Sequence, residues 1–281
     1  MCKCKNKLNT PFKKEDLEIV IATMNRNSLD FLIPMFPFCH FSAFSILIIN
    51  QTHKENFLIS EFPSVRVINS FEIGLSKSRN LGLKNAVGKI VLIADDDEIF
   101  KRDFDAVITN SFNLYPEAAA ICFAIEKPDG TLFKKYTSAT KMKLSQLDLF
   151  NVLSIEISLN KAVFDTLNLN FDEDFGLGSR FVMGEEAIFL SDIKNKNKQL
   201  IIEPKVIAVH PEISTVDKLN LEQRYYVQGA FLSRVLKGNY LKGLFLKLFF
   251  DVKQNKIEIN QIPIAFRSAD IGRNDFLEST K

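Results

Sequence analysis

Three consecutive carboxylates, Asp95, Asp96 and Asp97, are the residues whose type and spacing most directly permit chemistry. They follow the apolar run 90–94, whose length and β-branched content are typical of a strand buried on both faces. If the strand continues through them, Asp95 and Asp97 project to one side and offer hard oxygen ligands for Mg²⁺ or Mn²⁺. A solvated acidic turn that simply ends the strand is the alternative.

Three more residues could join this chemistry. Glu185 and Glu186 open a predicted helix, and His210 follows a predicted strand. Acidic residues in a first helical turn are also stabilised by the helix dipole, so a structural role for both glutamates stays open. Because successive helical residues point about 100° apart, we expect one glutamate to serve chemistry and the other to cap or brace. A lone histidine usually packs or lies at the surface, but one just past a strand can reach a metal.

The elements that must position these residues alternate between strands and helices, which predicts a mostly parallel α/β sheet. A turn at 127–130 followed by 131–133 is expected to add an antiparallel hairpin. We expect the segment 171–180 to be a glycine-rich loop. The predicted strands are 17–23, 45–50, 65–69, 89–94, 118–125, 154–159 and 200–209. The predicted helices are 28–35, 76–87, 103–114, 161–167 and 184–195, with a helical pattern from 218 onward.

Composition narrows the class of protein. The 281 residues are 46% hydrophobic and 25% charged, as in an ordinary globular protein. A net charge of only +2 argues against a nucleic-acid partner. Four cysteines, at positions 2, 4, 39 and 122, lack the spacing of a zinc site or a redox pair, which favours a reduced cytoplasmic protein. The basic N-terminus has no apolar stretch of a signal peptide behind it, and no window is long enough to span a membrane.

The helix predicted near 239–252 carries an apolar stripe flanked by lysines. The segment from Lys218 to Lys253 contains seven Lys and Arg residues but only two acidic residues. One interpretation is a basic amphipathic helix that touches an anionic membrane surface, on the inner face of the cytoplasmic membrane. A helix packed on the domain with a solvated basic face explains the pattern equally well. The stripe consists of Leu241, Leu244, Phe245, Leu248 and Phe249.

Taken together, these segments resemble the family 2 glycosyltransferases of the GT-A fold, of the bacterial surface-polysaccharide type. The motifs that carry the resemblance are IATMNR (21–26), IINQT (48–52), GLSKSRNLG (74–82), ADDDEIF (94–100), FDEDFGLGSRFVMGEE (171–186) and VHPE (209–212). The resemblance implies a Rossmann-like α/β/α sandwich with a mostly parallel sheet, a small antiparallel addition and C-terminal helices. It divides the chain into a flexible basic arm (1–16), a catalytic domain (17–215) and a helical extension (216–281). The catalytic domain then consists of a nucleotide-binding half (17–115) and an acceptor half (116–215).

The resemblance also implies roles for individual residues. Asp97, with Asp95 and His210, matches the ligands of Mn²⁺ or Mg²⁺, and Glu186 matches the catalytic base, with Glu185 binding the acceptor or supporting the loop. Asn50 stands where many members have an aspartate that reads the uracil ring. The residues that match nucleotide-sugar contacts are Thr23, Asn25, Arg26, Asn50, Lys77, Arg79, Asp95 and Asp96.

The expected function is metal-dependent, inverting transfer of a sugar from a nucleoside-diphosphate sugar, with a UDP-sugar favoured. The acceptor is a hydroxyl of a saccharide or of a lipid-linked molecule. Two alternatives remain, a sugar nucleotidyltransferase and a non-catalytic nucleotide-sugar-binding protein of the same fold. A nucleotidyltransferase is expected to carry a glycine-rich phosphate loop with a lysine after its first strand, where this chain has TMNRN (23–27).

Overall fold

A computed structural model describes residues 10–210 and 219–279. Within them, eight strands form one sheet in the order β3-β2-β1-β4-β7-β6-β8-β5. The strands are β1 (Leu17–Met24), β2 (Ser45–Gln51), β3 (Val65–Ser70), β4 (Ile90–Ala94), β5 (Ile99–Phe100), β6 (Ala118–Glu126), β7 (Ile157–Asn160) and β8 (Gln199–Val209). The longer helices are α2 (Leu75–Asn85), α3 (Phe104–Leu114), α6 (Glu185–Asn195), α7 (Leu221–Leu236), α8 (Tyr240–Lys253) and α9 (Ile262–Ser279). One-turn helices are α1 (Leu32–Met35), α4 (Gln146–Leu149) and α5 (Lys161–Phe164).

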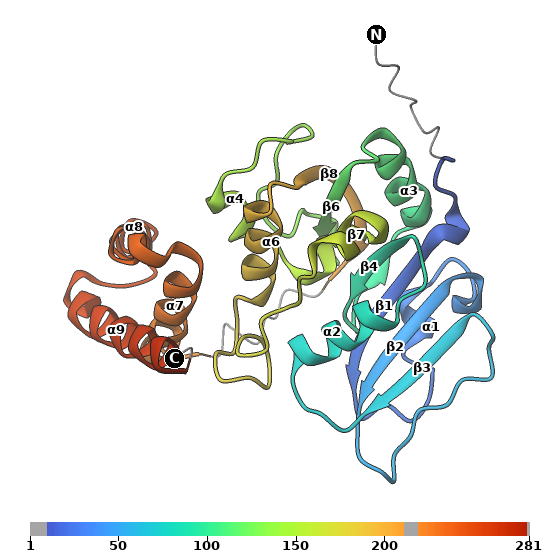
Figure 1. The fold of residues 1–281 in the computed structure, drawn as a ribbon, viewed down its shortest axis with the longest axis horizontal. Helices are drawn as coiled ribbons and strands as arrows, with labels where there is room; N and C mark the ends of the chain where they lie inside the picture. Colours follow the sequence, from blue (N-terminus) through green and yellow to red (C-terminus); the bar gives the residue numbers. More distant parts are fainter. Residues whose placement is uncertain (1–9, 211–218, 280–281) are drawn as a thin grey trace.

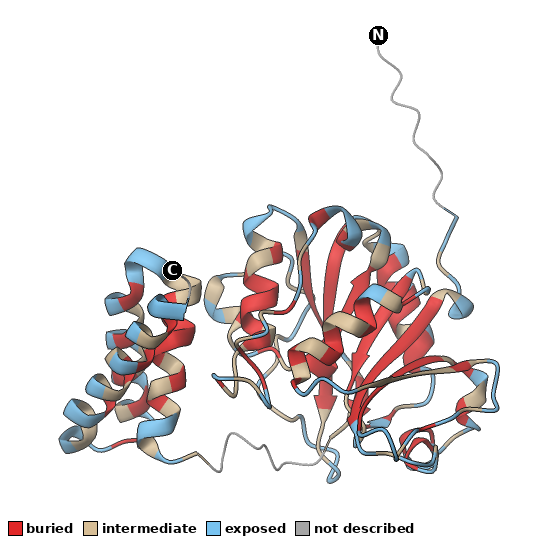
Figure 2. Cartoon of the chain, turned by 60° about the horizontal axis from the view of Figure 1, so that its bottom comes forward, coloured by how far each residue is buried: buried red, intermediate tan, exposed pale blue. Residues whose placement is uncertain are grey.

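Strand β1 shows how the sequence builds a three-layer sandwich. Its apolar residues alternate between the two faces of the sheet, because successive strand residues point to opposite sides. Ile19 and Ile21 pack in the core beneath α1 and α3, whereas Val20 packs in the core beneath α2, α5 and α6. Figure 2 shows the strands as the buried centre between these helices. The predicted α/β/α sandwich is therefore confirmed.

The sheet is mostly parallel, but the antiparallel part lies elsewhere than predicted. β1, β2, β3 and β4 pair in parallel, as do β6 and β8. β7 lies between β4 and β6 and is antiparallel to both. After the turn at 127–130, Leu132 forms an antiparallel bridge to Glu126, and the backbone N–H of Phe133 donates to the Ile125 carbonyl at 3.0 Å. The predicted antiparallel hairpin is therefore present only as this short pairing at the end of β6, and it contributes no strand to the sheet order.

The C-terminal helices form a third apolar core against the sandwich. α7, α8 and α9 gather beside α6, at one end of the molecule (Figure 1). Phe175 and Phe181 of the glycine-rich loop and Ile188 of α6 share a buried cluster with side chains of all three helices. This cluster joins the helical extension to the loop that precedes Glu185.

Part of the predicted N-terminal arm is attached to the sandwich. Phe12 exchanges two backbone hydrogen bonds with the side chain of Asn113, and Lys14 forms an ion pair with Asp105 of α3 at 2.6 Å. Residues 1–9 of the arm lie outside the described residues, as do Pro211 and Glu212 of the VHPE motif and the predicted domain boundary at 215–216.

Candidate active site

The acidic run forms a turn rather than a continuation of β4. β4 ends at Ala94, and Asp96 and Asp97 lie in a turn that leads into β5. The expectation that Asp95 and Asp97 project together from one strand was therefore wrong, because the backbone leaves the extended conformation before Asp97. The turn points the carboxylates of Asp95, Asp96 and Asp97 toward three different partners.

Arg79 of α2 is the central residue of the site. It is only 2% exposed, and its Nη2 donates to Asp95 Oδ1 at 3.2 Å. Its Nη1 donates to Glu185 Oε1 at 3.0 Å and to Glu186 Oε1 at 3.3 Å. One buried guanidinium thus connects the end of β4 with the start of α6, because its planar fork can bind several oxygens at once.

Glu185 and Glu186 face the same group, which the helical spacing did not predict. Both lie in the first turn of α6, and the guanidinium of Arg79 lies within reach of both carboxylates. Glu185 is buried beneath Gly176 of the preceding loop, whereas the Glu186 side chain keeps 18% of its surface exposed. Glu186 is therefore the more accessible carboxylate of the pair.

Burial raises the proton affinity of the acids around Arg79. Loss of hydration raises the pKa of Asp95, and the positive charge of Arg79 opposes that shift. Burial and the charge of Glu186 raise the pKa of Glu185. The fully buried Glu98, next to the acidic turn, has a pKa well above its usual value because it loses hydration. The site therefore concentrates more acidic groups than its two arginines, Arg26 and Arg79, can neutralise.

Asp96 connects the acidic turn to the loop after β1. Its Oδ2 accepts hydrogen bonds from the Thr23 hydroxyl and from Arg26 Nε and Nη2, the last two at 2.9 and 2.7 Å. Asn25 allows the loop to turn back, with a left-handed φ of 56° that asparagine tolerates better than most residues. Three predicted nucleotide contacts, Thr23, Arg26 and Asp96, are thus brought together, and Asn25 lies beside them at the surface.

Asn50 is buried and already fully hydrogen-bonded. Its Oδ1 accepts from the backbone N–H of Arg26, and its Nδ2 donates to the Arg26 carbonyl at 2.9 Å and to Asn69 Oδ1 at 3.0 Å. One donated hydrogen bond of the Asn50 amide therefore holds the loop that carries Arg26, and the other binds Asn69 of β3. Contact between Asn50 and a base stays a prediction.

Asp97 lies beside His210 because β5 pairs antiparallel with β8. Ile99 is opposite Val209 in the register, which places the residues that flank this pair next to each other. His210 Nε2 lies 3.4 Å from Asp97 Oδ1, and this hydrogen bond lowers the pKa of Asp97. A carboxylate oxygen suits both Mn²⁺ and Mg²⁺, whereas an imidazole nitrogen is more typical of transition metals and so fits Mn²⁺ better than Mg²⁺. Residues 10–210 and 219–279 contain no cluster of three such side chains, so exogenous ligands would have to complete a metal site. The oxygens of Asp95 instead contact Arg79 and the Ser154 hydroxyl.

Lys77 is not brought to this centre. It lies on a different side of α2 from Arg79 and forms an ion pair with Glu72 at 3.4 Å. It lines a separate cavity of about 520 Å³ between α2 and the segment 161–173. A nucleotide contact by Lys77 stays a prediction.

Comparison with known proteins identifies the family. A model of the glycosyl transferase family 2 matches residues 19–171, more than half of the chain. The chain belongs to this family. The matched residues include Thr23, Arg79 and the acidic turn of this glycosyltransferase, but end before Glu186 and His210. A comparison with curated proteins found no match.

Solved structures show the same fold. This glycosyltransferase is similar to residues 1–349 of S. aureus TarS, with a TM-score of 0.57, 14% identity and coverage of 90% of this chain and 78% of that one. The same TarS fragment in complex with UDP-GlcNAc gives a TM-score of 0.58, 13% identity and coverage of 90% and 79%. A longer TarS structure gives a TM-score of 0.56 at 14% identity, and the match covers 90% of this chain and 47% of that one. These likenesses establish the GT-A architecture of the sheet and helices.

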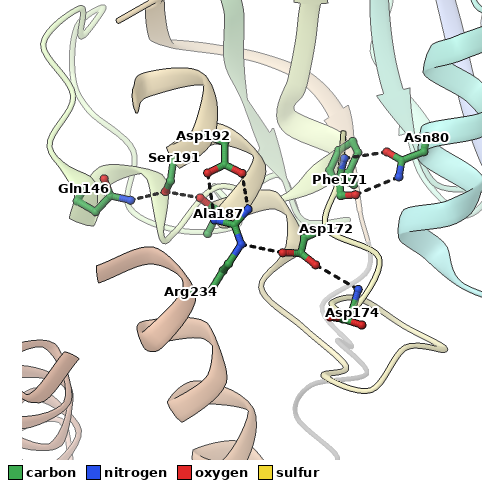
Figure 3. Close-up of polar contacts among 9 residues, drawn as sticks. All are labelled: Asn80, Gln146, Phe171, Asp172, Asp174, Ala187, Ser191, Asp192 and Arg234. Carbon is green, nitrogen blue, oxygen red and sulfur yellow. Dashed lines mark hydrogen bonds and ion pairs between the residues drawn. The ribbon is translucent and has the colours of Figure 1, made fainter. Parts of the chain in front are cut away.

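The loop 171–184 of the glycosyltransferase is held from both sides. On the α2 side, Asn80 bonds to the backbone N–H and carbonyl of Phe171 (Figure 3). On the α7 side, Arg234 Nε donates to Asp172 at 2.8 Å, and its Nη1 and Nη2 donate to Asp192 of α6 at 3.2 and 2.7 Å (Figure 3). The segment predicted as a loop is thus tied to the helices that carry Arg79 and Glu186.

Sequence reasoning missed several residues that support the site. Ser154 contacts Asp95, and Gln51 Oε1 accepts from the backbone N–H of Gly74 at the start of α2. Arg234 lies in a helix whose basic residues were attributed to a solvated or membrane-facing surface. Single serines, glutamines and arginines give no local signal, because only the tertiary fold brings them to their partners.

Proposed function

We propose that this glycosyltransferase moves a sugar from a nucleoside-diphosphate sugar, with a UDP-sugar favoured, to a hydroxyl group of its acceptor. The observation that carries the proposal is the contact of Arg79 with both Asp95 and Glu186. Ligands of α/β proteins bind at the carboxyl edge of the sheet, where Asp95 lies. The Arg79 contact connects this edge with Glu186, an accessible carboxylate on α6. A structure of TarS, which has the same fold, contains UDP-GlcNAc, and this supports the choice of a uridine donor.

Glu186 is the proposed catalytic base. The acceptor hydroxyl would give its proton to a Glu186 oxygen while the acceptor oxygen attacks the anomeric carbon. The bond from that carbon to the nucleotide oxygen breaks on the opposite side, so one displacement inverts the configuration. Arg79 orients Glu186 through Oε1 at 3.3 Å. General-base assistance of this kind contributes about 10²–10⁴ in rate.

Asp97 and His210 are the proposed ligands of a divalent cation, Mn²⁺ or Mg²⁺. Such an ion would neutralise negative charge on the donor diphosphate. Beyond the effect of burial, the charges of Asp95 and Asp97 help to raise the pKa of Glu98, so the turn is already rich in negative charge, and a dianionic donor would add to it. Arg26, held by Asp96, is placed to contact the nucleotide.

Glu185 and the loop 171–184 are proposed to shape the acceptor side. Glu185 is too buried to meet an acceptor directly, so its role is to support the loop through Gly176 and to hold Arg79. The acceptor is proposed to be a saccharide or a lipid-linked molecule of bacterial surface polysaccharide assembly.

A panel of nucleoside-diphosphate sugars tests the proposal. The purified chain is incubated with each donor, a set of saccharide acceptors and Mn²⁺, and release of the nucleoside diphosphate is measured. We expect acceptor-dependent release from a uridine donor, with the product sugar in the inverted configuration by NMR. The proposed chemistry would be contradicted if none of the donors releases its nucleoside diphosphate, or if the product sugar retains its configuration.

A further inference from the structure

Helix α8 presents apolar side chains to solvent along its outer face. Phe249 is 61% exposed, Phe245 59% and Leu241 50%. Leu246 and Phe250 are exposed as well. Large apolar side chains scattered singly are common on surfaces, but here five of the 14 residues of α8 are large, apolar and exposed, and they are spaced one turn apart as 241, 245 and 249 and as 246 and 250. We call these five residues the α8 patch.

Apart from a ring contact of Phe245 with Phe266 of α9, at 5.9 Å between centroids, the α8 patch lies outside the buried core of the bundle. The inner face of α8 consists of Tyr240, Leu244, Leu248 and Asp251, which are all buried. Of the apolar stripe predicted from the sequence, only Leu244 and Leu248 therefore face the protein. Figure 2 shows the inner side of the C-terminal bundle as buried and its outer side as exposed.

Between residues 237 and 256 the exposed charges have one sign, and the first exposed acid after them is Glu258. Lys237, Lys242, Lys253 and Lys256 are exposed. The one acid between residues 237 and 256, Asp251, is buried, where it binds Lys247 and the Tyr225 hydroxyl, each at 2.7 Å. The exposed face of this segment thus combines aromatic residues with four lysines and no carboxylate.

We propose that the α8 patch lies on an anionic lipid surface. Aromatic and leucine side chains enter the boundary between headgroups and acyl chains, while flanking lysines bind the anionic headgroups, as in other interfacial amphipathic helices. A second protein copy is a poorer match, because two identical faces would bring like-charged lysines together. No helix among residues 10–210 and 219–279 is long and apolar enough to cross a bilayer, so the contact is peripheral.

The lysines and the aromatic rings are expected to contribute separately to vesicle binding, so each contribution can be tested by its own variant. Each lysine near an anionic surface strengthens binding about fivefold at low salt, so Lys242→Gln with Lys253→Gln should weaken vesicle binding about 25-fold. Phe245→Ser with Phe249→Ser removes two inserted rings and should weaken binding at least about tenfold. Salt at about 1 M should weaken the wild-type protein's binding, because it shortens the screening length to about 3 Å.

Vesicle sedimentation of the full chain tests the proposal. Phosphatidylcholine vesicles are compared with vesicles that also contain phosphatidylglycerol. Matched controls are Val87→Ser with Leu114→Ser for exposed apolar residues, and Lys196→Gln with Lys198→Gln for exposed lysines, all on the sandwich domain. Circular dichroism checks that each variant is folded.

We expect binding only to the anionic vesicles, weakened by both α8 variants and by neither control. Absence of vesicle binding by the wild-type chain would overturn the proposal. So would equal binding by the two α8 variants and the controls. A concentration-dependent oligomer of the wild-type chain that Phe245→Ser with Phe249→Ser converts to a monomer, without vesicle binding, would instead identify the patch as a subunit interface.

Discussion

Replacing Arg79 with methionine removes the one group that holds three carboxylates together. Methionine fills similar space without charge, so Asp95, Glu185 and Glu186 lose their shared donor, whose nitrogens lie 3.0–3.3 Å from their oxygens. Removing one partner of a buried ion pair costs about 3–5 kcal/mol, because the remaining charge stays buried and uncompensated. We therefore expect Arg79→Met to lower the free energy of unfolding by at least about 3 kcal/mol at pH 8.

The loss should shrink as the pH falls. Burial already raises the pKa values of Asp95 and Glu185 in the folded chain, and loss of the guanidinium raises them further. A carboxylate with a raised folded pKa destabilises the protein only where it is charged, so its penalty is full above the folded pKa. The penalty disappears as the pH falls toward the unfolded value of about 4. One unit of additional shift is about 1.4 kcal/mol, so the loss at pH 5 should be smaller than at pH 8 by at least that amount.

Urea unfolding at pH 5 and pH 8, followed by circular dichroism because the chain has no tryptophan, measures both effects. Arg267→Met, at an exposed arginine of α9, is the matched control and should change stability by less than about 0.5 kcal/mol. Arg79→Lys keeps the charge but not the fork and should lie between wild type and Arg79→Met. A loss below about 1 kcal/mol for Arg79→Met that is equal at both pH values would refute the central role of Arg79.

Three further changes probe other parts of the site. Glu186→Gln should bind donor normally but slow transfer about 10²–10⁴-fold, as measured by nucleotide release with acceptor present. Asn50→Asp replaces the amide nitrogen, which donates two hydrogen bonds, with a carboxylate oxygen that faces Arg26 O and Asn69 Oδ1, and should lower the urea-unfolding free energy by about 1–3 kcal/mol. Arg234→Met removes the attachment of Asp172 to α7 and loosens the loop 171–184, so trypsin should cleave after Arg180 faster than in the wild-type chain.

Each of these changes has a control and a contradicting outcome. Glu117→Gln, at an exposed glutamate of the same type, should leave transfer unchanged; full transfer by Glu186→Gln would assign the base elsewhere. Unaltered stability of Asn50→Asp would mean that the amide is not needed to hold the loop. If Arg234→Met is cleaved after Arg180 no faster than wild type, the α7 contact does not restrain the loop.

The sheet and its flanking helices could be predicted because their residues follow simple periodic patterns. The apolar runs of β1, β2 and β4 and the mixed pattern of α2 identified those elements within one or two residues. The position of β7 could not be predicted, because its four residues give no sign of where they pair. Only the tertiary fold inserts them between β4 and β6.

Helix α9 lies in the region where the sequence predicted helices, but its bounds were not predicted, and its packing explains why. It meets α7 through small residues rather than an apolar stripe. A side chain on Gly272 would clash with the Tyr226 carbonyl, and one on Gly229 would clash with the carbonyl of Ala269. Two helix backbones in such close contact bury little side-chain area, so their sequence carries little hydrophobic periodicity.

The sequence predicted which types of residue make up the site, but not how these residues contact one another. The acidic turn, Glu186 and His210 stood out because they follow strands or open a helix. That Glu185 and Glu186 share Arg79 depends on the distance between α2 and α6, which no local pattern encodes. The use of Asn50 as a loop brace likewise depends on Asn69 of a neighbouring strand.

Binding of UDP with and without Mn²⁺ tests the central claim most directly, that donor and base groups meet in one metal-dependent centre. Thermal unfolding is recorded for the wild-type chain and for Asp97→Ala while UDP is titrated. Ligand at about 100 times its dissociation constant stabilises the folded state by about 2.7 kcal/mol. We predict that UDP stabilises the wild-type chain in the presence of Mn²⁺, much less without it, and that Asp97→Ala removes the Mn²⁺ effect. Equal stabilisation with and without Mn²⁺ in both proteins, or none in either, would contradict the account.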